Sequence, residues 1–235
     1  MSSGDGWTTC ASGHRHWGLF GAAGLLLVDK DKDRVILQHR APWTHEGDSW
    51  GVPGGARDSD EDPLAAAVRE AGEEAALSAA DVDPIGLYVD DHDGWSYTTV
   101  VARATRALHP IAANAESVSV RWHAISEVAE LPLHSGFAAA WQRLRDVPPP
   151  LYLVVADELV EHPLVATLVR DGIAVPRLPQ GIRAGGLGRL LPHLVQAEGN
   201  IRATAATYAG RGQVVTASTS TELAALSIDA LNTDV

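Results

Sequence analysis

The hydrophobic positions of the first 146 residues recur with two periods, which predict alternating strands and helices. An apolar run at 19–28 is short enough for a buried strand, and alternating side chains at 34–40 predict a strand that returns after the charged turn at 29–33. Further strands are predicted at 49–52, 85–89, 96–104 and 118–124, with an acidic turn at 90–94 and helices at 63–77 and 136–146. This pattern predicts an α/β domain.

The helix predicted at 63–77 follows a glycine-containing loop. Asp62 is suited to cap the helix because its side chain can accept a hydrogen bond from a free backbone N–H, and Pro63 suits the first helical position. Ahead of them, Pro53-Gly54-Gly55 predicts a tight loop in which glycine supplies a positive φ.

The composition changes after a run of prolines. All seven tryptophans lie between Trp7 and Trp141, whereas residues 151–235 contain no Trp, Phe or Lys. We therefore predict a domain at 1–147, a linker at 148–150 and a second module at 151–235. The second module alternates again, with strands predicted at 151–156, 173–178 and 213–217 and helices at 162–171, 187–196 and 221–231, which predicts a small α/β unit.

The charge balance limits the classes of partner. The chain has 18 basic and 30 acidic residues, a net charge of −12, which argues against binding bulk nucleic acid. A small anionic substrate can still bind where a metal ion neutralises it. The single cysteine, Cys10, excludes an intrachain disulfide. The N-terminus lacks a signal-peptide pattern, and its longest apolar run is far below the roughly 20 residues of a membrane span, so we expect a cytoplasmic protein without membrane contact.

Three carboxylates share one face of the helix predicted at 63–77. Glu70, Glu73 and Glu74 are spaced i, i+3 and i+4, so their charges repel and favour a divalent cation, although a solvated acidic face has the same pattern. Arg69 can pair with Glu73 one turn away. The apolar face predicted to pack inward consists of Leu64, Ala67, Val68, Ala71 and Ala75.

The spacing around these carboxylates resembles the Nudix box: Gly, five residues, Glu, seven residues, then Arg-Glu-aliphatic-any-Glu-Glu-any-Gly-aliphatic. The chain departs from it at Ala76, where the family has the glycine that helps to end the helix, so we expect a different helix end. Gly72, inside the helix, occupies an unrestricted position of the pattern and costs about 1 kcal/mol relative to Ala. The matching positions are Gly55, Glu61, Arg69, Glu70, Glu73, Glu74 and Leu77, with Ala71 in the aliphatic position.

The resemblance covers about residues 16–146 and implies a Nudix α/β/α sandwich with a mixed sheet. It implies a pyrophosphohydrolase that uses Mg²⁺, or Mn²⁺ in its place, to activate water for attack on phosphorus. Arg40 would then neutralise phosphate charge. The implied catalytic set is Arg69, Glu70, Glu73 and Glu74, and the implied metal ligands are Glu70 and Glu74, assisted by Glu73 and the carbonyl of Gly55.

Further segments are similar to MutT-type members of the family. Glu116, six residues before Trp122, stands where such members place a fourth metal ligand, and His134 and Ser135 lie near the loop that recognises oxidised guanine there. The layout resembles actinobacterial MutT-like proteins with an extra C-terminal segment. It implies sanitation of the nucleotide pool, with triphosphates such as 8-oxo-dGTP cut to the monophosphate and pyrophosphate. The substrate-contact candidates are Arg40, Trp50, Gly54, Gly55, His92 and His134, with Trp95 as a second stacking tryptophan.

Other interpretations remain open. The substrate could be ADP-ribose or a dinucleoside polyphosphate, or the chain could be a nucleotide-sensing regulator without activity, with residues 151–235 as its output. The second module could instead be a lid or could form a homodimer. Cys10, His14 and His16 are a separate candidate set of metal ligands. The glycine-rich segment 183–189 lacks the spacing of a phosphate-binding loop and is interpreted as a turn.

Overall fold

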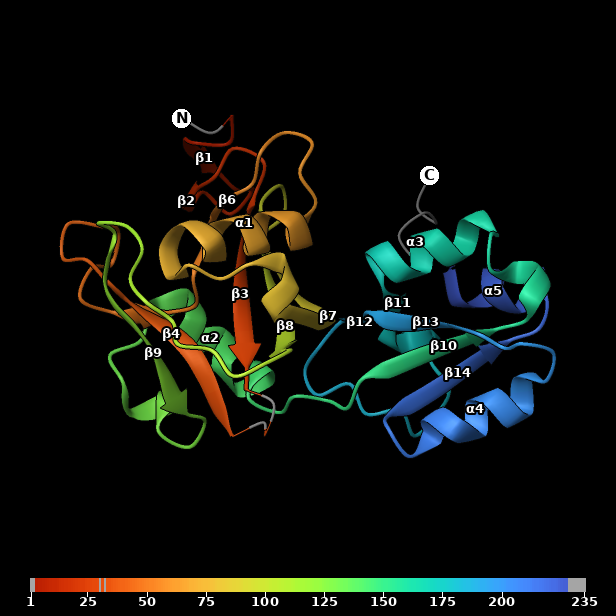
Figure 1. The fold of residues 1–235 in the computed structure, drawn as a ribbon. Coiled ribbons are helices and arrows are strands. Elements are labelled where there is room, and N and C mark those ends of the chain that lie inside the picture. The colour runs from red at the N-terminus through yellow and green to blue at the C-terminus, as the bar shows by residue number, and fades with distance from the viewer. Residues whose placement is uncertain (1–2, 30, 32, 228–235) are drawn as a thin grey trace. The chain divides into compact units, whose positions relative to one another are not determined.

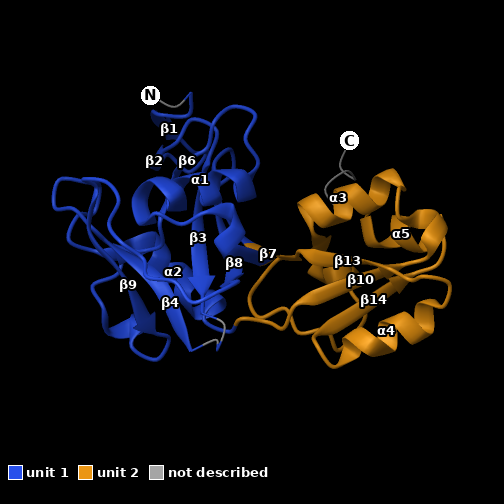
Figure 2. Cartoon of the chain, viewed as in Figure 1, with its two compact units in different colours: residues 1–84, 88–146 blue, residues 85–87, 147–235 orange. Residues whose placement is uncertain are grey.

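The computed structural model describes residues 3–29, 31 and 33–227, which form two compact units. Unit 1 consists of residues 1–84 and 88–146, and unit 2 consists of residues 85–87 and 147–235 (Figure 2). No helix in the described part of the chain has the length and apolar composition needed to cross a membrane.

Unit 1 is built on a mixed sheet (Figure 1). Its central strand β3 (Ala22–Val28) runs parallel to β8 (Ser96–Ala104) and antiparallel to β6 (Gly54–Ala56). All seven residues of β3 are buried, as expected for an uninterrupted apolar run covered on both faces. The remaining strands of this unit are β4 (Arg34–Arg40), which also pairs with β3, β5 (Trp50–Gly51), β9 (Ser117–Ala124), β7 (Val82–Asp91) outside residues 85–87, and the hairpin of β1 (Trp7–Thr9) with β2 (Arg15–Trp17).

Helices cover this sheet. Helix α1 (Pro63–Ala75) packs on β3, β6 and β8, while α2 (Ser135–Leu144) lies behind the sheet in the view of Figure 1. Short 3-10 turns follow at Ala79–Asp81 and Val128–Glu130. The predicted α/β/α sandwich with a mixed sheet is confirmed. The sequence pattern missed the β1–β2 hairpin, whose strands have only three residues each.

The start of α1 is as predicted and its end is not. Asp62 caps the helix by accepting a hydrogen bond from the backbone N–H of Ala65 at 2.9 Å, and Pro63 takes the first position. The helix ends at Ala75, because Ala76 adopts the left-handed conformation with φ 55°. The N–H of Leu77 then donates to the carbonyl of Ala71, so the chain closes the helix as a glycine would. The expectation of a different end at Ala76 was wrong.

Gly72 has a steric reason for its place in α1. A Cβ atom at Gly72 would lie 3.2 Å from the carbonyl oxygen of Leu77, where the chain folds back after the helix. The tight turn beyond Ala75 therefore opposes a side chain at this position.

Unit 2 is a small α/β module around the central strand β10 (Leu151–Val155). Strand β10 lies between β13 (Pro192–Gln196) and β14 (Gln213–Ala217), parallel to both. Residues 85–87 contribute a short pairing with β12 (Arg189–Leu190). The other elements of this unit are α3 (Pro163–Asp171), β11 (Ile173–Ala174), α4 (Ile201–Ala209), α5 (Ser220–Ser227) and 3-10 turns at Asp157–Leu159 and Val175–Arg177.

Two predictions for unit 2 were wrong. The range predicted as a helix at 187–196 contains strands β12 and β13 instead. Pro192 cannot donate a helical hydrogen bond and its ring disfavours the preceding turn, whereas proline is accepted as the first residue of an edge strand such as β13. The strand predicted at 173–178 has only two residues before a 3-10 turn. Helix α4, capped by Asn200, was missed. The helix predicted at 221–231 is present to Ser227, and its last positions lie outside the described residues.

The conformation of Ala76 gives a stability prediction. We expect Ala76→Gly to raise the free energy of unfolding by about 1 kcal/mol, because a left-handed L-residue costs about 1–2 kcal/mol. The greater chain entropy that glycine loses on folding offsets part of this gain. The measurement is urea denaturation. The matched control is Ala65→Gly, at an exposed helical position, which should lower stability by about 0.5–1 kcal/mol. A loss of stability in both variants would contradict the prediction.

Candidate functional site

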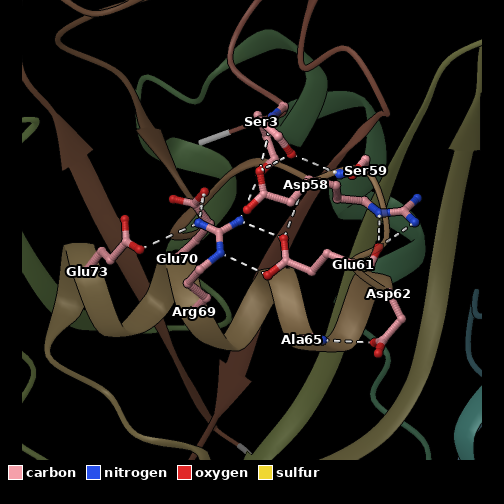
Figure 3. A network of polar contacts seen from close by, with 12 residues as sticks. Ser3, Asp58, Ser59, Glu61, Asp62, Ala65, Arg69, Glu70 and Glu73 are labelled. Atoms are coloured by element: carbon pink, nitrogen blue, oxygen red, sulfur yellow. Dashed lines mark hydrogen bonds and ion pairs between the residues drawn. The ribbon is translucent and has the colours of Figure 1, made fainter. Parts of the chain in front are cut away.

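Arg69 connects three parts of the site (Figure 3). Its Nε and Nη2 donate to both carboxylate oxygens of Glu61 at 2.9 and 2.8 Å, and its Nη1 donates to Glu70 at 2.7 Å. Nη2 also donates to the carbonyl of Ala56 at 2.9 Å. The predicted partner, Glu73, is only a secondary one at 3.6 Å. Arg69 therefore fixes the Glu70 side chain and the loop before α1, which gives it a positioning role.

Glu74 is buried although it lies on the acidic face of α1. Its side chain accepts hydrogen bonds from Nε2 of Gln38 at 2.9 Å and from the backbone N–H of Gly54 at 2.8 Å. Burial raises the pKa of Glu74 to about 7, and the negative charge of Glu70 contributes to the increase. Gln38 also donates to Oγ of Ser117, while its own Oε1 is buried without a hydrogen-bond partner. Sequence reasoning missed Gln38, because its contact with Glu74 joins residues 36 positions apart in the chain.

The two glycines before α1 allow the main chain of β6 to approach its neighbours closely. Neither Gly54 nor Gly55 has a positive φ, and both belong to strand β6, so the predicted loop conformation was wrong. A Cβ atom at Gly55 would lie 2.6 Å from a carboxylate oxygen of Glu70, and one at Gly54 would lie 2.5 Å from Cα of Gly24. Only glycine lets strand β6 lie between β3 and the carboxylates of α1.

These residues fit a divalent metal ion. Burial raises the pKa of Glu70, and repulsion from Glu73 and Glu61 adds to the effect against the lowering influence of Arg69. Both groups that donate hydrogen bonds to Glu74 are neutral, so its buried negative charge is not paired directly. A hard cation, which prefers oxygen ligands, would reduce the repulsion at Glu70 and pair with the buried charge of Glu74. Glu73 lies exposed one turn away on the same helix.

The fourth predicted ligand is placed differently. Glu116 is exposed, and its backbone N–H donates to the side chain of Asn114. Within the described residues no contact joins its carboxylate to Glu70 or Glu74. Its role as a ligand stays a prediction.

A cavity of about 510 Å³ adjoins this site, within the range of small-molecule pockets. Arg40, Gly54 and Gly55 line it next to the carboxylates, and aromatic rings line much of the rest. The other lining residues are Trp7, Arg15, His16, Trp17, Ala22, His45, Glu46, Gly51, Val52, Tyr88, Asp90, His92, Trp95, Tyr97, Thr99, His134, Ser135, Gly136, Phe137, Ala139 and Ala140.

Most predicted substrate contacts face this cavity, but Trp50 does not. Trp50 is buried, and its ring stacks on His39 at 4.8 Å between centroids. His134 lines the cavity and caps α2 by accepting a hydrogen bond from the N–H of Gly136, and burial lowers its pKa. His92 lines it beside Asp90, with its Nε2 3.3 Å from the carboxylate. Arg40 donates from Nε to the carbonyl of His45 at 3.2 Å.

Sequence reasoning also missed Glu46 and the tryptophans of the β1–β2 hairpin. The Glu46 carboxylate accepts hydrogen bonds from the N–H of Ser135 at 2.7 Å and from its hydroxyl at 2.6 Å. These two residues lie 89 positions apart, so no local pattern could relate them. Trp7 and Trp17, in contrast, flank the turn at Gly13, a weak hairpin signal that was available in the sequence.

The chain resembles known proteins over more than half of its length. The family model described as the NUDIX domain matches residues 19–144. "Putative 8-oxo-dGTP diphosphatase 3" of Mycobacterium tuberculosis is 51% identical over 164 residues, 66% of this chain and 75% of that protein. A "Nucleoside triphosphate pyrophosphatase/Nudix hydrolase fusion protein" of Bifidobacterium longum is 40% identical over 147 residues, 60% of this chain and 30% of the fusion protein. The crystal structure of a Nudix hydrolase from M. Smegmatis, RenU, is 49% identical with a TM-score of 0.57, and the match covers 61% of this chain and 94% of that one.

The buried carboxylate of Glu74 predicts a pH dependence of stability without metal. Its pKa rises from 4.5 in the unfolded chain to about 7 in the folded one. Between pH 4.5 and 7 the folded state therefore keeps a proton that the unfolded chain releases. Stability should therefore fall as pH rises from about 4.5 to 7, by up to about 3 kcal/mol at 1.4 kcal/mol per pKa unit. Denaturation in EDTA across this range is the measurement.

The control for this pH dependence is a pair of substitutions on α1. Glu74→Gln should remove most of the dependence and leave the protein more stable than the wild type at pH 8. Glu73→Gln, at an exposed position of the same helix, should keep it. Equal pH profiles for the wild type and Glu74→Gln would rule out the explanation.

The contacts of Arg69 give a second stability prediction. Arg69→Lys keeps the charge but loses the two parallel hydrogen bonds to Glu61, so we expect a loss of about 1.5–3 kcal/mol in urea denaturation. Arg143→Lys, at an exposed site on α2, should change stability by less than about 0.5 kcal/mol. Similar small effects in both variants would show that the contacts of Arg69 contribute little.

Proposed function

The chain belongs to the NUDIX domain family and is a Nudix hydrolase, and from this premise we propose that it is a Mg²⁺-dependent pyrophosphohydrolase of nucleoside triphosphates. We propose that oxidised purine triphosphates such as 8-oxo-dGTP are preferred, with the monophosphate and pyrophosphate as products. The observation that carries the proposal is the placement of Glu70 and Glu74 against Gly54 and Gly55 at the edge of an aromatic cavity.

Nudix hydrolases generally use divalent metal ions. In this chain Glu70, Glu74 and the carbonyl of Gly55 would hold the ion, with Glu73 beside them. When bound, Mg²⁺ would supply charge neutralisation and a lower pKa for the attacking water. The separate contacts of the carboxylates support distinct roles, since Glu70 is held by Arg69 and Glu74 by Gln38 and the main chain of Gly54.

The chain's own groups account for the remaining chemistry. Water attacks phosphorus, its proton passes to a carboxylate of α1, and the bridging oxygen leaves with the phosphate group that is not attacked. Arg40 lies at the cavity surface next to Gly54 and Gly55, where its guanidinium can neutralise negative charge on the phosphates. Tyr97, which also lines the cavity, stays a neutral phenol because burial raises its pKa.

The aromatic lining of the cavity suits a purine. Trp7, Trp17 and Trp95 present aromatic rings on which a base can stack. His134 and Ser135 add polar atoms for hydrogen bonds to its edge. The relative from Mycobacterium tuberculosis, which is named for 8-oxo-dGTP, supports an oxidised guanine as the base.

A panel of nucleotides tests the proposal. The protein is incubated with Mg²⁺ and the canonical dNTPs, 8-oxo-dGTP, ADP-ribose or a diadenosine polyphosphate, and products are separated by chromatography. We expect 8-oxo-dGTP to give the highest kcat/KM and to release pyrophosphate. Glu74→Gln should lower kcat by on the order of a hundredfold or more, whereas Glu130→Gln, at an exposed position, should not.

Other outcomes separate the alternatives. Preference for ADP-ribose or the dinucleotide would keep the hydrolase and overturn the proposed substrate. Nucleotide binding without turnover by the wild type would favour the sensing regulator.

A further inference from the structure

A cysteine and two histidines come together at the wall of the cavity. One ligand atom each of Cys10, His16 and His92 lies within 4.8 Å of the others. Cys10 is buried, with 4% of the residue exposed, and the rings of His16 and His92 are 4.6 Å apart between centroids. Both histidines line the cavity. The set differs from the sequence-based candidate, because His92 takes the place of His14, which is exposed.

The backbone holds these residues together without an ion. Cys10 and His16 belong to the β1–β2 hairpin, and His92 belongs to the acidic turn between β7 and β8. The N–H of Ala11 donates to the carbonyl of Asp93 at 2.9 Å, which ties the hairpin to the turn. Nε1 of Trp95 donates to the carbonyl of Gly18 at 2.9 Å. Such preorganisation lowers the cost of gathering ligands around a cation.

The cluster contains an unsatisfied nitrogen. Nε2 of His16 is buried and has no hydrogen-bond partner, while the ring itself is fixed by stacking on Trp95 at 4.1 Å between centroids. Buried polar atoms without partners are uncommon and destabilising. Burial and the nearby His92 lower the pKa of His16, which favours the neutral imidazole that binds metals. A bound cation would give this nitrogen a partner.

We propose that Cys10, His16 and His92 form a Zn²⁺ site, separate from the carboxylates of α1. A thiolate and two imidazoles are the ligands that Zn²⁺ selects, whereas Mg²⁺ prefers oxygen. Asp90, whose carboxylate is 3.3 Å from Nε2 of His92, supplies negative charge and a partner for that ring. The fourth position is left to water or to a ligand in the cavity. Binding releases the thiol proton of Cys10 and fixes the hairpin that carries Trp7 and Trp17.

A second cluster is a weaker candidate. One ligand atom each of His45, Glu46 and His134 also lies within 4.8 Å of the others. However, His45 and Glu46 are exposed, and the Glu46 carboxylate already accepts two hydrogen bonds from Ser135. This cluster also lacks a thiolate, so Co²⁺ bound there would give no thiolate-to-metal charge-transfer absorption.

Co²⁺ titration of the full-length protein tests the proposal under reducing conditions with excess Mg²⁺. We expect one equivalent of Co²⁺ to produce thiolate-to-metal charge-transfer absorption, and Zn²⁺ to displace it while Mg²⁺ does not. Cys10→Ser and His92→Gln should each abolish the band. His14→Gln is the control in the hairpin, and Glu74→Gln is the control at the carboxylate site, and both should keep it.

The charge-transfer absorption does not depend on hydrolysis, so the test remains valid even if the proposed function is wrong. If Cys10→Ser unfolds, His92→Gln decides, since His92 is only partly buried and lies in a turn. Co²⁺ binding without the charge-transfer band in the wild type would overturn the site. A band that persists in His92→Gln, or that disappears equally in His14→Gln, would do the same.

Discussion

Burial of the Glu74 carboxylate is the constraint on which the rest of the site depends. A negative charge under a sheet requires donors at fixed positions, and here Gln38 and the N–H of Gly54 supply them. The N–H of Gly54 reaches the carboxylate only because β6 lies close against Gly24 of β3, where a side chain would not fit. Gly54, which directly precedes the Nudix box, is thus required by the same carboxylate that the helix presents.

The second constraint is the guanidinium of Arg69, which joins the loop to the helix. By binding Glu61, Glu70 and the carbonyl of Ala56, it connects the loop before α1 to the acidic face of α1. This explains the long fixed spacing between Gly55 and Glu70. The loop must span from β6 to the N-terminus of α1 and also return Glu61 to Arg69.

Local chemistry decided which features could be predicted from the sequence. The cap at Asp62, the apolar run of β3 and the spacing of Glu70, Glu73 and Glu74 depend on neighbours in the chain, so they were readable. Other features depend on strand pairing and on turns that are far apart in sequence. They are the partners of Glu74, the burial of Trp50 and the proximity of Cys10 to His92. In unit 2, apolar periodicity alone suggested a helix at 187–196, although Pro192 favoured the strand that forms.

The unpartnered Oε1 of Gln38 has a consequence for the buried carboxylate. A primary amide carries a donor and an acceptor on the same carbon, so a half-turn of its terminal bond exchanges them without moving the main chain. An ionised Glu74 needs the donor that it now receives, whereas a protonated Glu74 would need an acceptor. Gln38 can therefore serve both charge states from a fixed backbone, so the strand it belongs to need not respond when Glu74 gains or loses its proton.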